Sequence, residues 1–313
     1  RLLTGKKNWS QPQQKMMARA ACIHGVRWGS ALLLTLVIGI TIQQLVSAAR
    51  HRNLSDQVQT TISSLNTSRG IILPPLKNLQ EFPHEIVLTE LRKQFETADE
   101  ARKLPLAYAL AHFDDIRVDF LVSQVGGALP DEVDNFVAAL GRNRTEAVTA
   151  LENAARTVES EQNWQHKARL AMLALHLRSP SLAKEMCQLR PDPIQRTLFI
   201  EECSTWHGDL TKLAQLVAES GDSALRSGVI LAVGSVPVAD VLAPEKQAWK
   251  PVLANWYATA PDTPTPTAPG WALRKWNLSV PEIERSKSPS DGMNWHVNNL
   301  GMTMLKIPGG SFM

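Results

Sequence analysis

Hydrophobic and polar positions follow two different patterns along the chain. From Trp28 to Ala49 no residue is charged, and the centre of this segment is almost entirely aliphatic. Between about Leu79 and Leu278, by contrast, apolar residues recur at helical spacing in short segments separated by Pro, Gly, Asp or Ser. The first pattern predicts a membrane-spanning helix, and the second predicts a series of short amphipathic helices.

The uncharged segment 28–49 has the length of a transmembrane helix. At a rise of about 1.5 Å per residue, roughly 20 residues cross a hydrocarbon core about 30 Å thick. Trp28 lies where an interfacial aromatic residue would be, and the amides of Gln43 and Gln44 suit the opposite interface, so the apolar part proper ends near Ile42.

Two other interpretations of this segment remain open. A cleavable signal peptide would fit, with the small residues at 46–48 as its cleavage site, although the basic region before it is longer than usual. A buried helix of a soluble domain would also be apolar, but its flanks would not normally be exclusively basic over fifty residues. We therefore favour a single membrane span.

Positive charge is concentrated before and just after this span. Residues 1–52 carry eight Lys or Arg and no acid, which leaves 25 basic against 30 acidic residues in the remainder. The surplus of acids in the body disfavours a nucleic-acid partner. Six cations precede the span: Arg1, Lys6, Lys7, Lys15, Arg19 and Arg27.

The positive-inside rule therefore places the N-terminal side in the cytoplasm and the long body outside it. Gln14–Trp28 mixes Met, Ala and Ile with three cations. This stretch is either a helix resting on an anionic leaflet or a plain stop-transfer flank.

Region 79–278 is expected to be a helical domain. Helices this short cannot bury their apolar face alone and must pack on neighbours. Segments rich in small residues recur at intervals of roughly 60 residues, at Lys103–Phe113, Ala168–Leu177 and Leu225–Val236, which predicts two helix pairs per interval and fits an irregular HEAT-like array better than a strict tetratricopeptide series. A compact, non-repetitive helical bundle is the alternative. The predicted helices are 86–95, 104–113, 118–125, 132–140, 146–158, 166–177, 182–189, 194–206, 210–219, 224–236 and 249–257.

Prolines and polar stretches mark the limits of this domain. Segment 50–78 is expected to prolong the membrane helix as a polar stalk that Pro74 and Pro75 end, because proline lacks the amide proton that a helix interior requires. Ala260–Pro269, APDTPTPTAP, favours extended backbone.

The segment that follows contains two tryptophans. Gly270–Leu278 is predicted to be a terminal helix that caps the array with Trp271 and Trp276, rather than a platform for a ligand. Segment 279–298, with SKSPSDG at Ser286–Gly292, is expected to be a linker.

The last residues, NLGMTMLKIPGGSFM at 299–313, resemble the start of the formylglycine-generating enzyme, or sulfatase-modifying-factor, family. In that family a Gly-Met pair leads into a strand and an Ile-Pro-Gly-Gly-Ser-Phe turn. The resemblance implies the truncated start of an α+β domain, and the family's catalytic cysteines and metal-binding residues fall beyond it. The matching residues are Gly301, Met302, Ile307, Pro308, Gly309, Gly310, Ser311 and Phe312.

The rest of the chain resembles the interdomain region of large bacterial membrane proteins that combine an N-terminal serine/threonine protein kinase domain with a C-terminal domain of this type. The resembling stretches are QQKMMARAACIHGVRW before the span, Leu189–Leu210 and Gly270–Leu278. The resemblance implies a kinase domain before Arg1, and the chain itself is expected to be a piece of a longer protein. The chain contains no Gly-rich loop, catalytic loop or Asp-Phe-Gly, so kinase activity is not assigned to it.

Few residues of the chain could carry chemistry. The three cysteines are too widely spaced for a disulfide framework. Cys203 and His207 are four residues apart on one predicted helix face, and a zinc site would need Cys187 and His166 as further ligands. The ordinary interpretation is a buried thiol and a histidine near a helix end.

Two pairs of carboxylates are adjacent in sequence, Asp114 with Asp115 and Glu201 with Glu202. Neighbouring residues on a helix diverge by about 100°, so neither pair forms an acid/base couple by itself. Both pairs are interpreted as solvated faces. No catalytic, cofactor-binding or metal-binding residue is therefore assigned, and no cofactor is expected.

These observations predict a mainly α chain with one transmembrane helix. The main hypothesis for its function is a non-catalytic, membrane-anchored helical connector between a kinase domain and a formylglycine-generating-enzyme-type domain. The alternative is a protein-interaction scaffold whose helical array binds a peptide or protein partner. An enzymatic role ranks third, because the residues it needs would lie outside both ends. The expected segments are a basic juxtamembrane segment (1–27), a transmembrane helix (28–49), a stalk (50–78), a helical domain (79–278), a linker (279–298) and the truncated domain start (299–313).

Overall fold

The structure is a computed structural model that describes residues 10–65, 73–158, 163–262, 264–307 and 309. These residues are mainly α-helical, and β1 and β2 pair as a two-stranded sheet near the C-terminal end. The mainly α prediction is therefore confirmed. The chain divides into two compact units, residues 1–60 and 61–313.

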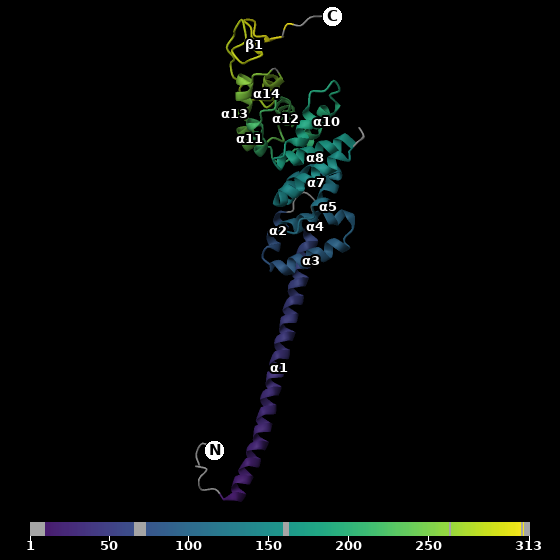
Figure 1. Cartoon of the computed structure of the whole chain (residues 1–313), viewed down its shortest axis with the longest axis vertical. Helices are drawn as coiled ribbons and strands as arrows, with labels where there is room; N and C mark the ends of the chain where they lie inside the picture. Colours follow the sequence, from purple (N-terminus) through teal and green to yellow (C-terminus); the bar gives the residue numbers. More distant parts are fainter. Residues whose placement is uncertain (1–9, 66–72, 159–162, 263, 308, 310–313) are drawn as a thin grey trace. The chain divides into compact units, whose positions relative to one another are not determined.

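The α-helices follow one another along the chain with short connections (Figure 1). Short 3-10 turns precede or follow some of them, among them η2 (Val125–Gly127) and η3 (Pro130–Glu132). The elements are α1 (Gln11–Leu65), α2 (Leu73–Leu79), α3 (His84–Thr97), α4 (Glu100–His112), α5 (Val118–Gln124), α6 (Val133–Leu140), α7 (Arg144–Arg156), α8 (Trp164–His176), α9 (Ser181–Cys187), α10 (Ile194–Thr205), α11 (Thr211–Glu219), α12 (Ser223–Ser235), α13 (Ala243–Thr259), α14 (Pro264–Lys275), β1 (Trp295–Val297) and β2 (Thr303–Leu305).

Helix α1 is uninterrupted over 55 residues and contains the whole predicted span. The apolar side chains of the predicted span 28–49 are exposed, and none of the most hydrophobic 18-residue window of α1 is buried, whereas Val58, Ile62 and Leu65 near its end are buried. By length and composition this helix is able to cross a membrane, a criterion that a signal sequence near an N-terminus also meets. The prediction that polar residues after the span prolong the same helix is confirmed as far as Leu65. Of the six cations before the span, Arg1, Lys6 and Lys7 lie outside the described residues.

Pro74 and Pro75 begin a helix, which corrects the prediction that they end one. Helix α1 ends at Leu65, residues 66–72 lie outside the described part of the chain, and both prolines occupy the first turn of α2. Backbone amides in a first turn have no helical acceptor, so prolines lose no hydrogen bond there.

Every helix predicted between residues 86 and 257 is present, as α3 to α13. Most ends agree within two residues, but α13 begins six residues earlier than predicted, at Ala243. Its start is stabilised by Glu245, whose Oε2 accepts the backbone N–H of Leu242 at 2.7 Å. Helix α12 begins as predicted, because Asp222 Oδ1 accepts the backbone N–H of Leu225 at 2.9 Å.

The three predicted segments rich in small residues form the core of unit 61–313 as α4, α8 and α12. In α4 every residue from Leu104 to Ala111 is buried, and α8 and α12 are buried almost as completely. Helix α4 packs on α6, α6 on α8, α8 on α10, α10 on α12, and α12 on α14. In the described part of the chain, each interval from the start of one core helix to the start of the next contains four helices, that is two helix pairs, as predicted, and Figure 1 shows the succession of α4, α8, α12 and α14.

The proline-rich segment Ala260–Pro269 is largely helical, which corrects the prediction of extended backbone. Helix α14 begins at Pro264, so Pro264 and Pro266 occupy its first turn, where proline is tolerated. Farther along, Leu273 and Ala272 are buried, and α14 packs against both α12 and α13. Tertiary packing here outweighs the local preference of the prolines.

Three buried indoles connect successive parts of unit 61–313. The Nε1–H of Trp206 donates to the carbonyl oxygen of Leu129 at 3.2 Å. The Nε1–H of Trp249 donates to the carbonyl oxygen of Leu210 at 2.9 Å. The Nε1–H of Trp295 donates to the carbonyl oxygen of Ala260 at 2.8 Å. Each acceptor carbonyl lies in a connection between helices, so each indole attaches a loop to a more distant element.

The C-terminal hairpin lies partly within the predicted linker 279–298. Strand β1 is at its end and pairs antiparallel with β2, with Trp295 opposite Leu305. The strand expected after Gly301 and Met302 is present as β2, whose three residues are all exposed. The Ile-Pro-Gly-Gly-Ser-Phe turn lies mostly outside the described residues, which include Ile307 and Gly309 but omit 308 and 310–313.

Candidate functional site

The cysteines and histidines considered for zinc do not form a metal site. In the described ranges, no group of three or more His, Cys, Asp or Glu side chains is arranged to hold a metal ion. Helix α10 ends at Thr205, so His207 lies beyond it and does not share a helix face with Cys203, contrary to the prediction. The Nδ1 of His207 donates instead to the carbonyl oxygen of Gly208 at 2.9 Å.

Cys187 and Cys203 are buried thiols. Burial raises the pKa of Cys187 to about 12 and raises the pKa of Cys203 still further. A thiol is a weak nucleophile and a weak metal ligand until it loses its proton, so both side chains are poor candidates for chemistry near neutral pH. Cys187 instead packs against Gly228 of α12, where a glycine allows close approach of α9.

The acidic pairs are only in part the solvated faces that were predicted. Asp115 is 15% exposed and is paired with Arg92 at 2.6 Å and with Arg117 at 3.1 Å. Asp114 is well exposed and pairs with an arginine of another element, Arg142, at 2.7 Å.

Glu202 is likewise 15% exposed and pairs with Arg169 of α8 at 2.9 Å, whereas Glu201 is exposed. The prediction is therefore wrong for Asp115 and Glu202. Both carboxylates hold elements together through ion pairs, which a pattern of adjacent acids does not reveal.

The two tryptophans of Gly270–Leu278 differ in burial, and only Trp271 lies within α14, because the helix ends at Lys275. Trp276 is 2% exposed, as expected of an indole that caps a helical core. Trp271 is 38% exposed, and the Nζ of Lys275 lies 4.9 Å from its ring centroid. The capping role therefore applies fully to Trp276 and partly to Trp271.

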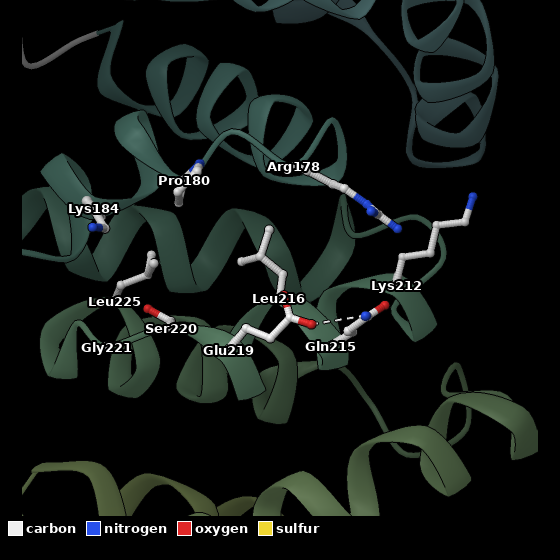
Figure 2. Close-up of a pocket in the computed structure, with 10 residues that line it drawn as sticks. All are labelled: Arg178, Pro180, Lys184, Lys212, Gln215, Leu216, Glu219, Ser220, Gly221 and Leu225. Atoms are coloured by element: carbon white, nitrogen blue, oxygen red, sulfur yellow. Dashed lines mark hydrogen bonds between the residues drawn. The ribbon is translucent and has the colours of Figure 1, made fainter.

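A pocket of about 370 Å³ opens between the α8–α9 connection, α11 and the start of α12 (Figure 2). Its lining combines basic side chains, apolar side chains and one carboxylate. The lining residues are Arg178, Pro180, Lys184, Lys212, Gln215, Leu216, Glu219, Ser220, Gly221 and Leu225.

Three cations reach this pocket from three different parts of the chain. Lys184 of α9 lies 3.9 Å from Asp222. Among the described residues, neither Arg178 nor Lys212 forms an ion pair within 4.0 Å or a side-chain hydrogen bond. Arg178 has a φ of 61°, in the left-handed region, and its carbonyl oxygen accepts a hydrogen bond from Arg144 at 3.2 Å.

The middle of the pocket is apolar. Figure 2 shows Leu216 between Lys184 at one end and the side chains of Arg178 and Lys212 at the other. Leu225 is buried and also lines the pocket, at the end near Lys184 in Figure 2. Glu219 supplies the carboxylate, and its Oε1 accepts a hydrogen bond from the Nε2 of Gln215 at 3.0 Å.

Beneath the pocket, Arg226 of α12 connects three elements. It is 5% exposed, and its Nη1 donates to the carbonyl oxygen of Ser220 at 2.9 Å. Its Nη2 donates to Asp262 Oδ2 at 2.7 Å, and its guanidinium carbon lies 4.2 Å from the ring centroid of Trp256. Arg226 thus links the pocket wall to the α13–α14 connection that also accepts the indole of Trp295.

No protein-family model, curated protein or solved structure matches this chain.

Sequence reasoning missed the basic residues of the pocket. Arg178, Lys184 and Lys212 are separated by up to 34 positions and match no motif, so only the packing of α9 and α11 beside α12 reveals their proximity. The Ser-Pro turn after Arg178 indicates a loop but gives no sign of a left-handed residue before it.

Proposed function

We propose that this chain is a non-catalytic, membrane-anchored helical connector. Helix α1 would lie across the bilayer with its basic N-terminal side in the cytoplasm, and the helical array would lie outside. The array would connect a kinase domain before it to a formylglycine-generating-enzyme-type domain after it. The observation that carries this proposal is the exposed apolar segment 28–49 within one continuous helix that runs on to Leu65.

The packing of the array supports a role as a spacer or coupler. The core helices α4, α8 and α12 are linked in chain order through α6 and α10, an arrangement that fits an irregular HEAT-like array. The hairpin is attached to this array, because Trp295 donates to Ala260 and the backbone N–H of Asn294 donates to Pro261 at 3.0 Å. Met304 and Leu305 of the hairpin are 42% and 50% exposed, a surface that a following domain would cover.

The proposed membrane topology is tested by inserting a reporter protein directly after Leu278 and keeping the remainder of the chain. We expect a phosphatase that is active only outside the cytoplasm to be active, and a fluorescent protein that matures only inside to be dark. An N-terminal epitope should stay on the same polypeptide after alkaline extraction of membranes, which a cleaved signal peptide would not allow. If the phosphatase is inactive and the fusion is shielded on the cytoplasmic side, the proposed orientation, with the helical array outside the cytoplasm, is contradicted.

A matched variant tests the span itself. Leu36→Arg places a charge at the centre of the apolar segment, at a cost of about 3 kcal/mol in insertion. We expect this variant to lose phosphatase activity and membrane retention, whereas Leu36→Ala should keep both. Retention of the arginine variant in alkaline-washed membranes would count against insertion of segment 28–49.

A second role, as a scaffold that binds a peptide or protein partner, is favoured by the basic pocket between α9, α11 and α12. Arg178 and Lys212 are cations without an ion-pair partner among the described residues, and they border a concave surface. Binding at this pocket would give the array a partner in addition to the membrane.

A further inference from the structure

We propose that the pocket beside α11 binds an acidic protein segment in which an apolar side chain lies between carboxylates. This inference rests on the second function proposed above, the interaction role of the array, and it specifies the chemistry of the partner. It holds whether or not α1 crosses a bilayer.

The charges of the pocket favour an anionic partner. Arg178, Lys184 and Lys212 line the pocket together with one carboxylate, that of Glu219, which already accepts a hydrogen bond from Gln215. Lys184 lies 3.9 Å from Asp222, with 46% of its side chain exposed, so it remains available to a second acid. A carboxylate that approaches Arg178 or Lys212 would gain a charge-assisted hydrogen bond that these groups do not make within the described chain.

The arrangement of these charges indicates how the partner would lie. Figure 2 shows cations at both ends of the pocket and Leu216 in the middle, with Pro180 above it in this view. A segment with an apolar side chain flanked by acids would place that side chain on Leu216 and its acids at the two ends. Burial of the apolar side chain would contribute affinity, and the two ends would fix its direction.

Other anions fit the pocket less well. A phosphate group carries more negative charge than a carboxylate and would lie near Glu219, which repels it. The body outside the basic N-terminal end has more acids than bases, which disfavours a nucleic acid. A lipid surface is flat on this scale, whereas this site is a concavity of about 370 Å³.

The backbone around the pocket is held in place. The N–H of Arg178 donates to the carbonyl oxygen of Leu175 at 2.8 Å, and the N–H of Ser179 donates to that of Ala174 at 2.8 Å. Arg144 binds the carbonyl oxygen of Arg178. The backbone that carries Arg178 is therefore fixed before binding, so that only the side chain has to be ordered when a partner binds.

The test measures fluorescence anisotropy of a labelled peptide with the full chain in a nonionic detergent. The probe peptide has two glutamates on each side of one leucine. One control peptide replaces the glutamates with glutamines, and another replaces the leucine with serine. We expect the probe to bind more tightly than either control, and its affinity to fall as ionic strength rises from about 0.05 to about 0.5 M.

Variants assign this binding to the pocket. Arg178→Gln and Lys212→Gln should each weaken binding of the probe about two- to fivefold, as expected for exposed ion pairs. Lys77→Gln is the matched control, because Lys77 lies on α2, away from the helices that line the pocket, and should change nothing. Thermal unfolding curves that superimpose with those of the unchanged protein show that the variants fold.

A charge exchange gives a second readout. The double variant Arg178→Glu with Lys212→Glu should lose the acidic probe and gain affinity for a peptide with two lysines on each side of leucine. Equal binding of the acidic and glutamine peptides would overturn the proposal, as would loss of binding in Lys77→Gln to the same extent as in Arg178→Gln.

Three further results would also overturn the proposal while identifying the true occupant. Tighter binding of inorganic phosphate than of the probe would indicate a phosphate ligand. Vesicle binding through the pocket residues would indicate a lipid. Self-association that the pocket variants abolish would indicate a second copy of this chain. A protein partner that binds the unchanged chain and the pocket variants with equal affinity would refute this pocket as the binding site. The proposed interaction role of the array would still hold in that case.

Discussion

Single buried polar groups hold the array together at defined points. Glu245 is 3% exposed and accepts the backbone N–H groups of both Leu210 and Leu242, at 2.9 and 2.7 Å. Trp249 on the same helix donates to the carbonyl oxygen of Leu210. The backbone N–H and the carbonyl oxygen of Leu210 are therefore both hydrogen-bonded to side chains of α13. These two bonds fix the α10–α11 loop to α13, although the loop has no secondary structure of its own.

We expect Trp249→Phe to lower the free energy of unfolding by about 1–3 kcal/mol, because the buried carbonyl oxygen of Leu210 would lose its indole donor. Urea unfolding followed by circular dichroism measures this change. The control is Trp271→Phe, at an indole that is 38% exposed, which should cost much less. Equal losses in the two variants would show that the hydrogen bond is not the cause.

His176 makes stability depend on pH. Burial lowers its pKa below the ordinary value of 6.5, and this effect outweighs its hydrogen bond to the carbonyl oxygen of His207 and the charges of Asp134 and Asp209, which raise the pKa. The unfolded chain therefore takes up a proton at a higher pH than the folded chain. Stability should be retained above about pH 6.5 and should fall as the pH drops below that value.

The measurement is the urea midpoint between about pH 5 and about pH 8. His176→Asn should flatten this pH profile, whatever its effect on stability at neutral pH. Some slope should remain, because burial also lowers the pKa of His112 and His166. An unchanged slope in the variant would show that His176 does not contribute.

Helices α9 and α12 pack closely where a glycine faces a cysteine. Gly228 of α12 leaves room for Cys187 of α9, and a methyl group at this glycine would overlap the cysteine sulfur. We expect Gly228→Ala to destabilise the fold by about 1–3 kcal/mol through overpacking. Thermal unfolding should show that adding Cys187→Ala recovers part of this loss, and strict additivity of the two changes would contradict the contact.

The sequence predicted element type well because helical spacing is a local property. The apolar residues of α4, α8 and α12 recur at helical intervals, and Asp222 marks a helix start by a hydrogen bond to a residue only three positions away. The errors fall where distant contacts decide the outcome. The prolines of α14 predict extended backbone, and packing of Leu273 in the core makes the segment helical.

The candidate pocket could not be predicted for the same reason. Arg178 and Lys212 belong to separate elements, and nothing in their local sequence distinguishes them from ordinary surface cations. Asp115 and Glu202 show the converse, because adjacent acids that suggested a solvated face are largely buried in ion pairs. Local sequence patterns identify secondary-structure elements, whereas binding sites and ion pairs can be identified only once the packing of those elements is known.

At the scale of the whole molecule, Arg226 joins the pocket wall to the C-terminal hairpin. It binds Ser220 and Asp262, and the same α13–α14 connection accepts the indole of Trp295 from β1. A change at the pocket wall therefore has a direct physical route to the hairpin, through one buried arginine and one loop.

We expect Arg226→Gln to destabilise the fold by about 3 kcal/mol, because it removes a buried guanidinium that pairs with Asp262 at 2.7 Å. Amide hydrogen exchange should accelerate first in the hairpin, residues 295–305, and least in α4. Arg156→Gln removes an exposed pair with Glu152 and should leave both regions unchanged. Uniform acceleration across the array in Arg226→Gln would argue against a specific link to the hairpin.

The order in which the helices pack also has a consequence for how unit 61–313 folds during synthesis. The main contacts of α8, α10, α12 and α14 are with helices no more than three positions away along the chain. During synthesis from the N-terminal end, each of these helices would therefore meet most of its partners within a few helices of its own appearance. Under tension applied at the C-terminal end, α14 should be the first of the helices to detach, from α12 and α13. The helices before it should then detach one after another, in order from the C-terminal end.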